Sequence, residues 1–303
     1  MSELISTDKL SKKYRGKYAL KDADLHISQG DIYGLIGRNG AGKTTLLKLI
    51  NSQIRPSEGR VLMKGRPLVY GSPGIALGAL VESPGFYPDF SALDNLRFKC
   101  QAMGRDKKGY AQSLLEIVEL ADTGSKKARQ FSLGMKQRLG IALALVDEPE
   151  LLILDEPING MDPQGIKDIR ELLVKLNRER GVTILVSSHI LDELAKFATT
   201  YGIIKDGLLI TEFSREELEV RNTSGIEITA PDAQAVAAAL KEGLHLQDIR
   251  LSSPQRLVIR DRVEAPDQVS RFLFDQRIYV SQLYVRQHSL EDYFMGLTGG
   301  NEA

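Results

Sequence analysis

Residues 37–44 combine glycine, lysine and threonine at a spacing suited to binding phosphate. Their sequence, GRNGAGKT, fits the pattern G-x-x-x-x-G-K-[ST]. In this pattern, backbone N–H groups and the start of a helix surround phosphate oxygens. Lys43 would supply positive charge at the β- and γ-phosphates, and Thr44 would offer a hydroxyl to Mg2+. The alternative is a glycine-rich turn without a ligand, which the flanking strand and helix patterns disfavour.

Two adjacent carboxylates, Asp155 and Glu156, end the apolar run at residues 151–154. Placing both at the end of a buried strand is costly unless a cation or water meets them. Asp155 is suited to hold Mg2+, and Glu156 to orient or deprotonate a water that attacks a γ-phosphate. Taken alone, this pattern fits a solvated strand end equally well.

A third motif, FSLGMKQR at residues 131–138, predicts a second helix start that could bind an anion. Ser132 is suited to cap the helix, and Gly134 would allow close backbone approach. A capped helix without a ligand is the alternative. The segment resembles the signature motif of ABC ATPases, and the resemblance covers about the first 215 residues. In that family, the signature of one subunit closes over ATP held by the phosphate loop of another.

Further motifs follow in the family's order. Tyr14 resembles the aromatic residue that stacks on adenine, residues 159–162 (NGMD) resemble the D-loop, and His189 resembles the switch histidine. Tyr14 could otherwise be a packing residue, and a lone histidine at a strand end is often structural. Where the family commonly has a glutamine linking Mg2+ and water to the membrane subunit, this chain has Glu82, a carboxylate that can bind Mg2+ but adds negative charge.

Three residues depart from the usual family pattern. Leu133 replaces the first glycine of the signature, Met135 replaces its glutamine, and Ile158 replaces a threonine. Together with residues 84–88 and 289–294, these departures are similar to the ATPase subunits of bacterial bacitracin and lantibiotic resistance exporters.

The resemblance assigns roles to individual residues of this chain. Glu156, His189 and Lys43 are expected to act in catalysis, and Thr44, Glu82 and Asp155 to hold the metal. The nucleotide is expected to contact Tyr14, Gly37, Arg38, Asn39, Gly40, Ala41, Gly42, Lys43, Thr44, Thr45, Ser132, Gly134, Met135 and Asp162.

The elements that must position these residues can be predicted from hydrophobic spacing. Strands are expected at 32–36, 151–154 and 182–186, with helices at 43–50 and 164–180. Continuous apolar strands separated by a helix are typical of a parallel sheet buried on both faces. Helical spacing recurs at 92–103, 110–120 and 134–145. The family resemblance implies an α/β P-loop NTPase (RecA-like) core with an antiparallel β subdomain and an inserted helical subdomain, at about 88–148.

The pattern changes after residue 214, and a domain boundary is predicted between residues 222 and 223. Strands at 226–229, 248–251, 256–260 and 280–285 alternate with helices at 232–242 and 265–275, and a last helix is expected at 290–297. The order βαββαβ predicts a small α+β, ferredoxin-like domain at 223–303, with an accessory or dimerisation role. Its predicted core residues are Leu240, Leu244, Phe272, Phe274 and Tyr284.

Composition limits the class of protein. The 303 residues are 42% hydrophobic and 26% charged, with 40 basic and 40 acidic residues, so neither disorder nor a strongly basic nucleic-acid binder is indicated. The single cysteine, Cys100, the absence of a secretory pattern at the start, and the lack of a long apolar run favour the cytoplasm.

The resemblance implies an ATP-hydrolysing subunit of an ABC exporter that binds ATP and Mg2+. It is expected to pair with a second, identical ATPase subunit on transmembrane permease subunits, at the cytoplasmic face of the membrane, without nucleic acid. One rival is a soluble ABC ATPase in nucleic-acid or ribosome-associated work, which would usually carry tandem ATPase domains or a long coiled-coil insertion. A small-molecule kinase, the other rival, would leave residues 131–138 and 159–162 unexplained.

Overall fold

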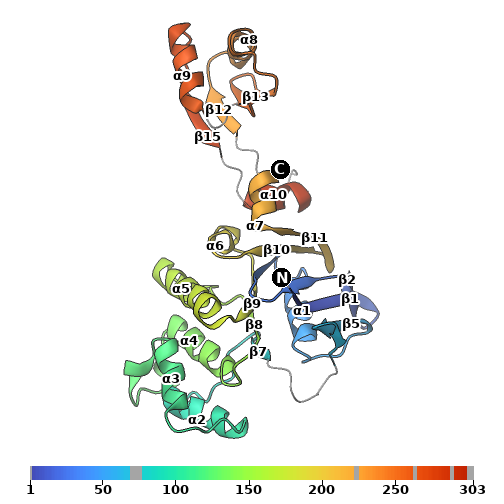
Figure 1. Ribbon diagram of the computed structural model, residues 1–303, viewed down its shortest axis with the longest axis vertical. Coiled ribbons are helices and arrows are strands. Elements are labelled where there is room, and N and C mark those ends of the chain that lie inside the picture. Colours follow the sequence, from blue (N-terminus) through green and yellow to red (C-terminus); the bar gives the residue numbers. More distant parts are fainter. Residues whose placement is uncertain (1, 69–76, 222–224, 262–264, 287–289, 299–303) are drawn as a thin grey trace. The chain divides into compact units, whose positions relative to one another are not determined.

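The computed structural model describes residues 2–68, 77–221, 225–261, 265–286 and 290–298, which belong to two compact units (Figure 1). The first unit comprises residues 1–215 and the second residues 216–303. Each unit has its own cluster of buried apolar side chains. The predicted boundary between residues 222 and 223 lies outside the described residues.

A six-stranded sheet forms the centre of the first unit, with the order β11-β10-β4-β9-β8-β7. The five strands from β10 to β7 are parallel, and β11 pairs antiparallel with β10. The predicted buried strands are confirmed, because every residue of β4 and β9 is buried. The strands are β4 (Ile32–Ile36), β7 (Leu77–Leu80), β8 (Leu151–Asp155), β9 (Thr183–Ser188), β10 (Thr200–Lys205) and β11 (Leu208–Ser214).

A second, antiparallel sheet accompanies the parallel one, as the family resemblance implied. Helix α1 (Lys43–Ile50) buries Leu46, Leu47 and Ile50 in a core that also contains residues of the antiparallel sheet and of β8. This shared core fixes the start of α1 relative to the end of β8. The antiparallel strands are β1 (Glu3–Tyr14), β2 (Lys17–Ala23), β3 (His26–Ser28), β5 (Glu58–Met63) and β6 (Arg66–Pro67).

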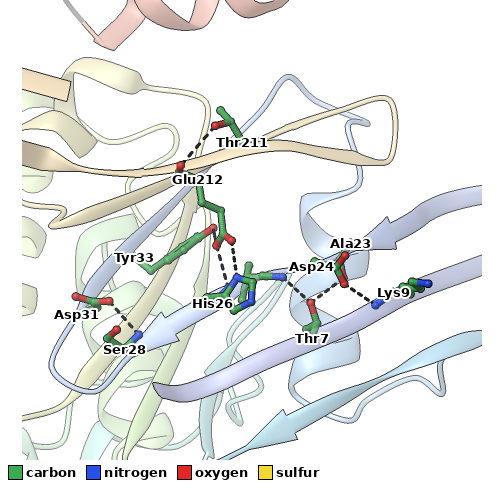
Figure 2. Close-up of polar contacts among 11 residues, drawn as sticks. Thr7, Lys9, Ala23, Asp24, His26, Ser28, Asp31, Tyr33, Thr211 and Glu212 are labelled. Carbon is green, nitrogen blue, oxygen red and sulfur yellow. Dashed lines mark hydrogen bonds and ion pairs between the residues drawn. The ribbon is translucent and has the colours of Figure 1, made fainter. Parts of the chain in front are cut away.

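Polar contacts join the two sheets around Glu212 of β11 (Figure 2). The buried Tyr33 of β4 donates its hydroxyl hydrogen to Glu212 Oε1 over 2.7 Å. His26 of β3 donates its backbone N–H to Oε1, and its Nδ1 lies 2.9 Å from Oε2. Burial, with the Glu212 carboxylate nearby, holds the pKa of Tyr33 well above its ordinary value, so Tyr33 remains a neutral donor.

The predicted helical segment is confirmed, with helix ends that differ from the expected ones by three residues or fewer. Helices α2, α3 and α4 pack on one another, and α4 also packs against β7 (Figure 1). Helix α5 contacts β9. The helices of this unit besides α1 are α2 (Ala92–Ala102), α3 (Tyr110–Ile117), α4 (Leu133–Ala144), α5 (Pro163–Arg180) and α6 (Leu191–Ala195), with short 3-10 turns at Ala121–Thr123 and Ala128–Gln130.

The second unit has the predicted βαββαβ order and the antiparallel sheet order β13-β14-β12-β15, which is the ferredoxin-like arrangement. Its elements are α7 (Arg215–Arg221), which begins on the last residue of the first unit, β12 (Gly225–Thr229), α8 (Ala233–Leu244), β13 (Ile249–Ser253), β14 (Arg256–Ile259), α9 (Pro266–Asp275), β15 (Gln282–Arg286) and α10 (Leu290–Thr298).

The predicted core of the second unit is partly wrong. Leu240 is fully buried, and Leu244 and Phe272 pack against the core. Phe274, in contrast, is 73% exposed and Tyr284 is 45% exposed. On α9, Val269 and Leu273 occupy the inward face, and Phe274, one residue further along the helix, points away from it. On β15, Leu283 faces the core, and the neighbouring Tyr284 lies on the opposite face of the strand.

Within the described residues, every helix is too short or too polar to cross a membrane.

Candidate nucleotide site

The phosphate loop occupies residues 37–42 between strand β4 and helix α1, as predicted. Gly42 precedes the helix with φ of 109°, and a Cβ at this position would lie 2.7 Å from the Ala19 carbonyl oxygen, so the loop requires glycine there. The Lys43 ammonium folds back over the loop and donates to the carbonyl oxygens of Gly37 (2.6 Å) and Arg38 (3.3 Å). A cation and a helix start therefore meet at one loop.

Asp155, the last residue of β8, connects this loop to the neighbouring strands. Thr44 donates its hydroxyl hydrogen to Asp155 Oδ2 over 2.7 Å. Ser187 donates to Asp155 Oδ1 over 2.6 Å, and its Oγ accepts the Glu156 N–H at 3.0 Å. Strand pairing brings Asp155 and Ser187 opposite each other. The predicted Thr44–Asp155 pair thus forms a compact set of oxygen donors.

The Glu156 carboxylate bridges two of the predicted catalytic residues. Its Oε1 lies 3.0 Å from Lys43 Nζ, and its Oε2 lies 2.9 Å from His189 Nδ1. The Glu156 side chain is 19% exposed and that of Lys43 is 6% exposed. Glu156 also has a φ of 48°, a left-handed conformation that costs a non-glycine residue about 1–3 kcal/mol and is frequent at functional sites.

Lys43, Thr44 and Glu156 border a cavity of about 380 Å3 between the phosphate loop and strand β2. The predicted Thr45 lines it, and so does Tyr18 of β2, which the sequence analysis did not select. Tyr14 is 48% exposed, with Lys12 Nζ 5.3 Å from its ring. The cavity is lined by Lys17, Tyr18, Ala19, Asn39, Gly40, Gly42, Lys43, Thr44, Thr45, Glu156, Asp206 and Gly207.

The signature and D-loop residues are absent from the lining of this cavity and cap helices α4 and α5. Ser132 caps α4 by accepting the Met135 N–H at 3.3 Å, and Asp162 caps α5 by accepting the Gly165 N–H at 3.1 Å. Leu133 is 45% exposed, and its Cδ2 lies 3.6 Å from the position of a Cβ on Gly160. The two motifs are therefore neighbours, with Ser132 exposed beside Gly134, which is half-buried.

Glu82, predicted as a metal ligand, pairs with a lysine of helix α1. It follows β7 with φ of 69°, and its Oε1 lies 2.5 Å from Lys48 Nζ of helix α1. The structure thus brings together Lys43, Thr44, Asp155, Glu156 and His189, while Glu82 pairs with a lysine one helical turn beyond Thr44.

Sequence reasoning missed Ser187 and Lys48. Ser187 is a fully buried serine in a run of apolar residues at the end of β9, which is a detectable signal because buried hydroxyls require partners. Lys48 gave no such signal, because a lysine on a predicted helix is ordinarily solvated.

Comparison with known proteins gives a consistent result. Residues 20–159 match the profile of the ABC transporter family. The bacitracin transport ATP-binding protein BcrA of Bacillus licheniformis is 37% identical over 302 residues, 99% of each chain. The lantibiotic transport ATP-binding protein SrtF of Streptococcus pyogenes is 38% identical over 210 residues, 69% of this chain and 90% of that protein.

Solved structures agree in fold. The dimeric post-hydrolysis state of the ATP-binding cassette MJ0796, bound to ADP and Pi, superposes with a TM-score of 0.62 at 25% identity and covers 70% of this chain and 99% of that one. The protein cbiO1 of Clostridium perfringens, part of the complex cbiONQ, gives a TM-score of 0.65 at 26% identity over 81% of this chain and 97% of that one.

Proposed function

The chain belongs to the family of ABC transporter ATP-binding proteins, and we propose that it hydrolyses MgATP at the site around Lys43 to drive export through a separate permease. The observation that carries this proposal is the cluster at the end of β8, in which Lys43, Thr44, Asp155, Glu156 and His189 are linked by contacts of 2.7 to 3.0 Å.

The donor set fits Mg2+, which prefers hard oxygen ligands and keeps several waters. The Thr44 hydroxyl and Asp155 carboxylate would hold the ion, which when bound neutralises charge on the phosphates. The loop amides and the start of α1 would hold the phosphates, with Lys43 turning from its carbonyl partners toward them. Glu156 would orient and deprotonate the attacking water, and His189 would keep the Glu156 carboxylate in position.

A second copy of the chain would complete the site. Ser132, Gly134 and Met135 form the start of α4 with Ser132 exposed, and a helix start attracts anions. Placed over the nucleotide of the other copy, this surface would close the sandwich described for ABC ATPases. ATP would then join two copies, and hydrolysis would release them.

The surface that we assign to the permease lies beside the loop that carries Glu82. Tyr87, Phe90 and Phe98 are 61%, 45% and 38% exposed and pack edge to face, with ring centroids 5.1 to 6.2 Å apart. An exposed aromatic cluster is typical of a protein contact. A permease bound there would hold the chain at the cytoplasmic face of the membrane and would act directly on the loop after β7.

For the exported substrate, we propose a peptide antibiotic, a drug or a lipid-like compound. The support comes from the names of full-length relatives, which include the bacitracin protein and, at 33% identity, the daunorubicin resistance protein DrrA3 of Streptomyces coeruleorubidus.

The test is to purify the tagged chain from detergent-solubilised membranes of its native cell and to identify its partners by mass spectrometry. A multi-span protein in stoichiometric amount, lost in the variant Phe98→Ser, is the expected result. The matched control is Phe274→Ser, at an exposed phenylalanine of the second unit. Recovery with ribosomes or nucleic acid instead would refute the proposal. Growth of cells carrying the complex on bacitracin, a lantibiotic or daunorubicin then identifies the class of substrate.

A further inference from the structure

The ion pair between Lys48 and Glu82 has no part in the chemistry assigned above. Lys48 Nζ lies 2.5 Å from Glu82 Oε1, and the side chains are 25% and 64% exposed. Exposed ion pairs contribute little to folding stability, with a median of about 0–1 kcal/mol. Folding stability therefore gives little reason for this pair, and its position in the fold suggests another role.

That position is one helical turn from the metal donors. Thr44 and Lys48 are four residues apart on α1, so they share one face of the helix. Strand β7 pairs with β8 in parallel, with Leu80 opposite Leu154. Glu82 and Glu156 each follow that register pair by two residues. The loop after β7 thus delivers a carboxylate to the same end of the sheet as the catalytic one.

We propose that Lys48 is a positioning residue that holds the Glu82 carboxylate beside the metal donors and cancels its charge. The proposal rests on the function proposed above. A free carboxylate at this position would repel the triphosphate and attract Mg2+. Paired with Lys48, Glu82 has the net charge of the glutamine that the family commonly places there, and it retains an oxygen able to face the metal.

The pair also joins two different elements of the first unit. Lys48 belongs to the helix that begins at the phosphate loop, whereas Glu82 belongs to the loop beside the exposed aromatic cluster Tyr87, Phe90 and Phe98. A permease that displaces this loop would separate the pair and unmask the Glu82 charge next to the nucleotide. Coupling between permease and nucleotide would then act through Mg2+ affinity.

The experiment measures ATP binding by isothermal titration calorimetry, with Mg2+ and with EDTA. The proteins compared are the full-length wild type, Lys48→Met, Glu82→Gln and the double variant. Lys48→Met is expected to weaken Mg2+-free ATP binding about threefold to tenfold, because the uncompensated Glu82 carboxylate would repel the triphosphate. Its binding of MgATP should change less. The dissociation constant of Mg2+-free ATP divided by that of MgATP should therefore rise. Adding Glu82→Gln should restore that ratio.

The control is Lys167→Met, which removes an exposed helix-surface lysine that pairs with Glu171 at 3.8 Å on α5. It should leave both dissociation constants unchanged. A Lys48→Met protein with the wild-type ratio, or a double variant that keeps the raised ratio of Lys48→Met, overturns the proposal. Thermal unfolding of each variant identifies loss of folding. If the proposed function itself is wrong, the wild type neither binds nor hydrolyses ATP.

Discussion

Removing the charge of Glu156 should strengthen ATP binding while abolishing hydrolysis. Lys43 Nζ lies 3.0 Å from Glu156 Oε1, with both side chains mostly buried. ATP must draw Lys43 away from this partner and must place its phosphates near the carboxylate. A hydrogen-bonded contact to a charged group contributes about 1.5–3 kcal/mol. Glu156→Gln should therefore lower the dissociation constant of ATP by about tenfold to a hundredfold.

Hydrolysis should fall in the same variant, because glutamine cannot accept a proton from the attacking water. Loss of a general base costs about 10^2- to 10^4-fold in rate. Phosphate release measures the rate, and calorimetry measures the dissociation constant. Glu150→Gln is the matched control. Glu150 immediately precedes β8, at the opposite end from Glu156, and Glu150 pairs with Lys64 at 2.5 Å. That variant should leave both quantities at wild-type values.

The two readouts refute different parts of the reasoning. Hydrolysis at the wild-type rate in Glu156→Gln would show that another group activates the water. An unchanged dissociation constant would show that the Lys43 pair has no influence on nucleotide affinity, even if hydrolysis is lost.

Three further changes test other parts of the structure. Thr44→Val removes the hydroxyl that contacts Asp155, so the Mg2+ concentration for half-maximal hydrolysis should rise about tenfold while Mg2+-free ATP binding stays within twofold; an unchanged Mg2+ requirement would exclude Thr44 from the metal set. Tyr33→Phe removes a buried donor to Glu212 and should lower the free energy of unfolding by about 1.5–3 kcal/mol in denaturant titrations; no change would mean that solvent replaces this bond. The hydrogen bond to the Glu212 carboxylate raises the folded-state pKa of His26 above its ordinary value of 6.5. The His26–Glu212 pair therefore stabilises the folded chain fully below about pH 6.5, and this stabilisation is lost as pH rises through the folded pKa. The midpoint of thermal unfolding should thus fall less between pH 5.5 and 8.5 in His26→Gln than in the wild type, and equal slopes would contradict this assignment.

Local patterns predicted much of the fold because they coincide with tertiary burial. The strand 32–36, the glycine loop and the helix 43–50 match β4 and α1, since their apolar residues are the ones that the sheets bury. The βαββαβ order of the second unit was predictable for the same reason. Side-chain exposure at Phe274 was not, because hydrophobicity alone does not tell which residue of a helix faces the sheet.

Short motifs and the family resemblance predicted which residues form the site, but not the contacts between them. Lys43 and Thr44 stand in one motif, and Asp155 and Glu156 in another. The contact between Thr44 and Asp155 spans 111 positions and arises from the packing of α1 on β8. The partner of Glu82 was unpredictable from its own segment, because Lys48 lies 34 positions away on a different element.

The distribution of charge and exposure supports the proposal that a second copy completes the site. On the phosphate loop, Lys43 is already balanced by Glu156, so one chain offers little net positive charge to a triphosphate beyond the helix start. Ser132 caps a second helix start that is exposed next to Leu133, which is 45% exposed. Closing that surface over the nucleotide of another copy would bury Leu133 and add the missing anion site. In this proposal ATP itself would supply the charge that makes the contact favourable, so assembly and catalysis would depend on the same ligand.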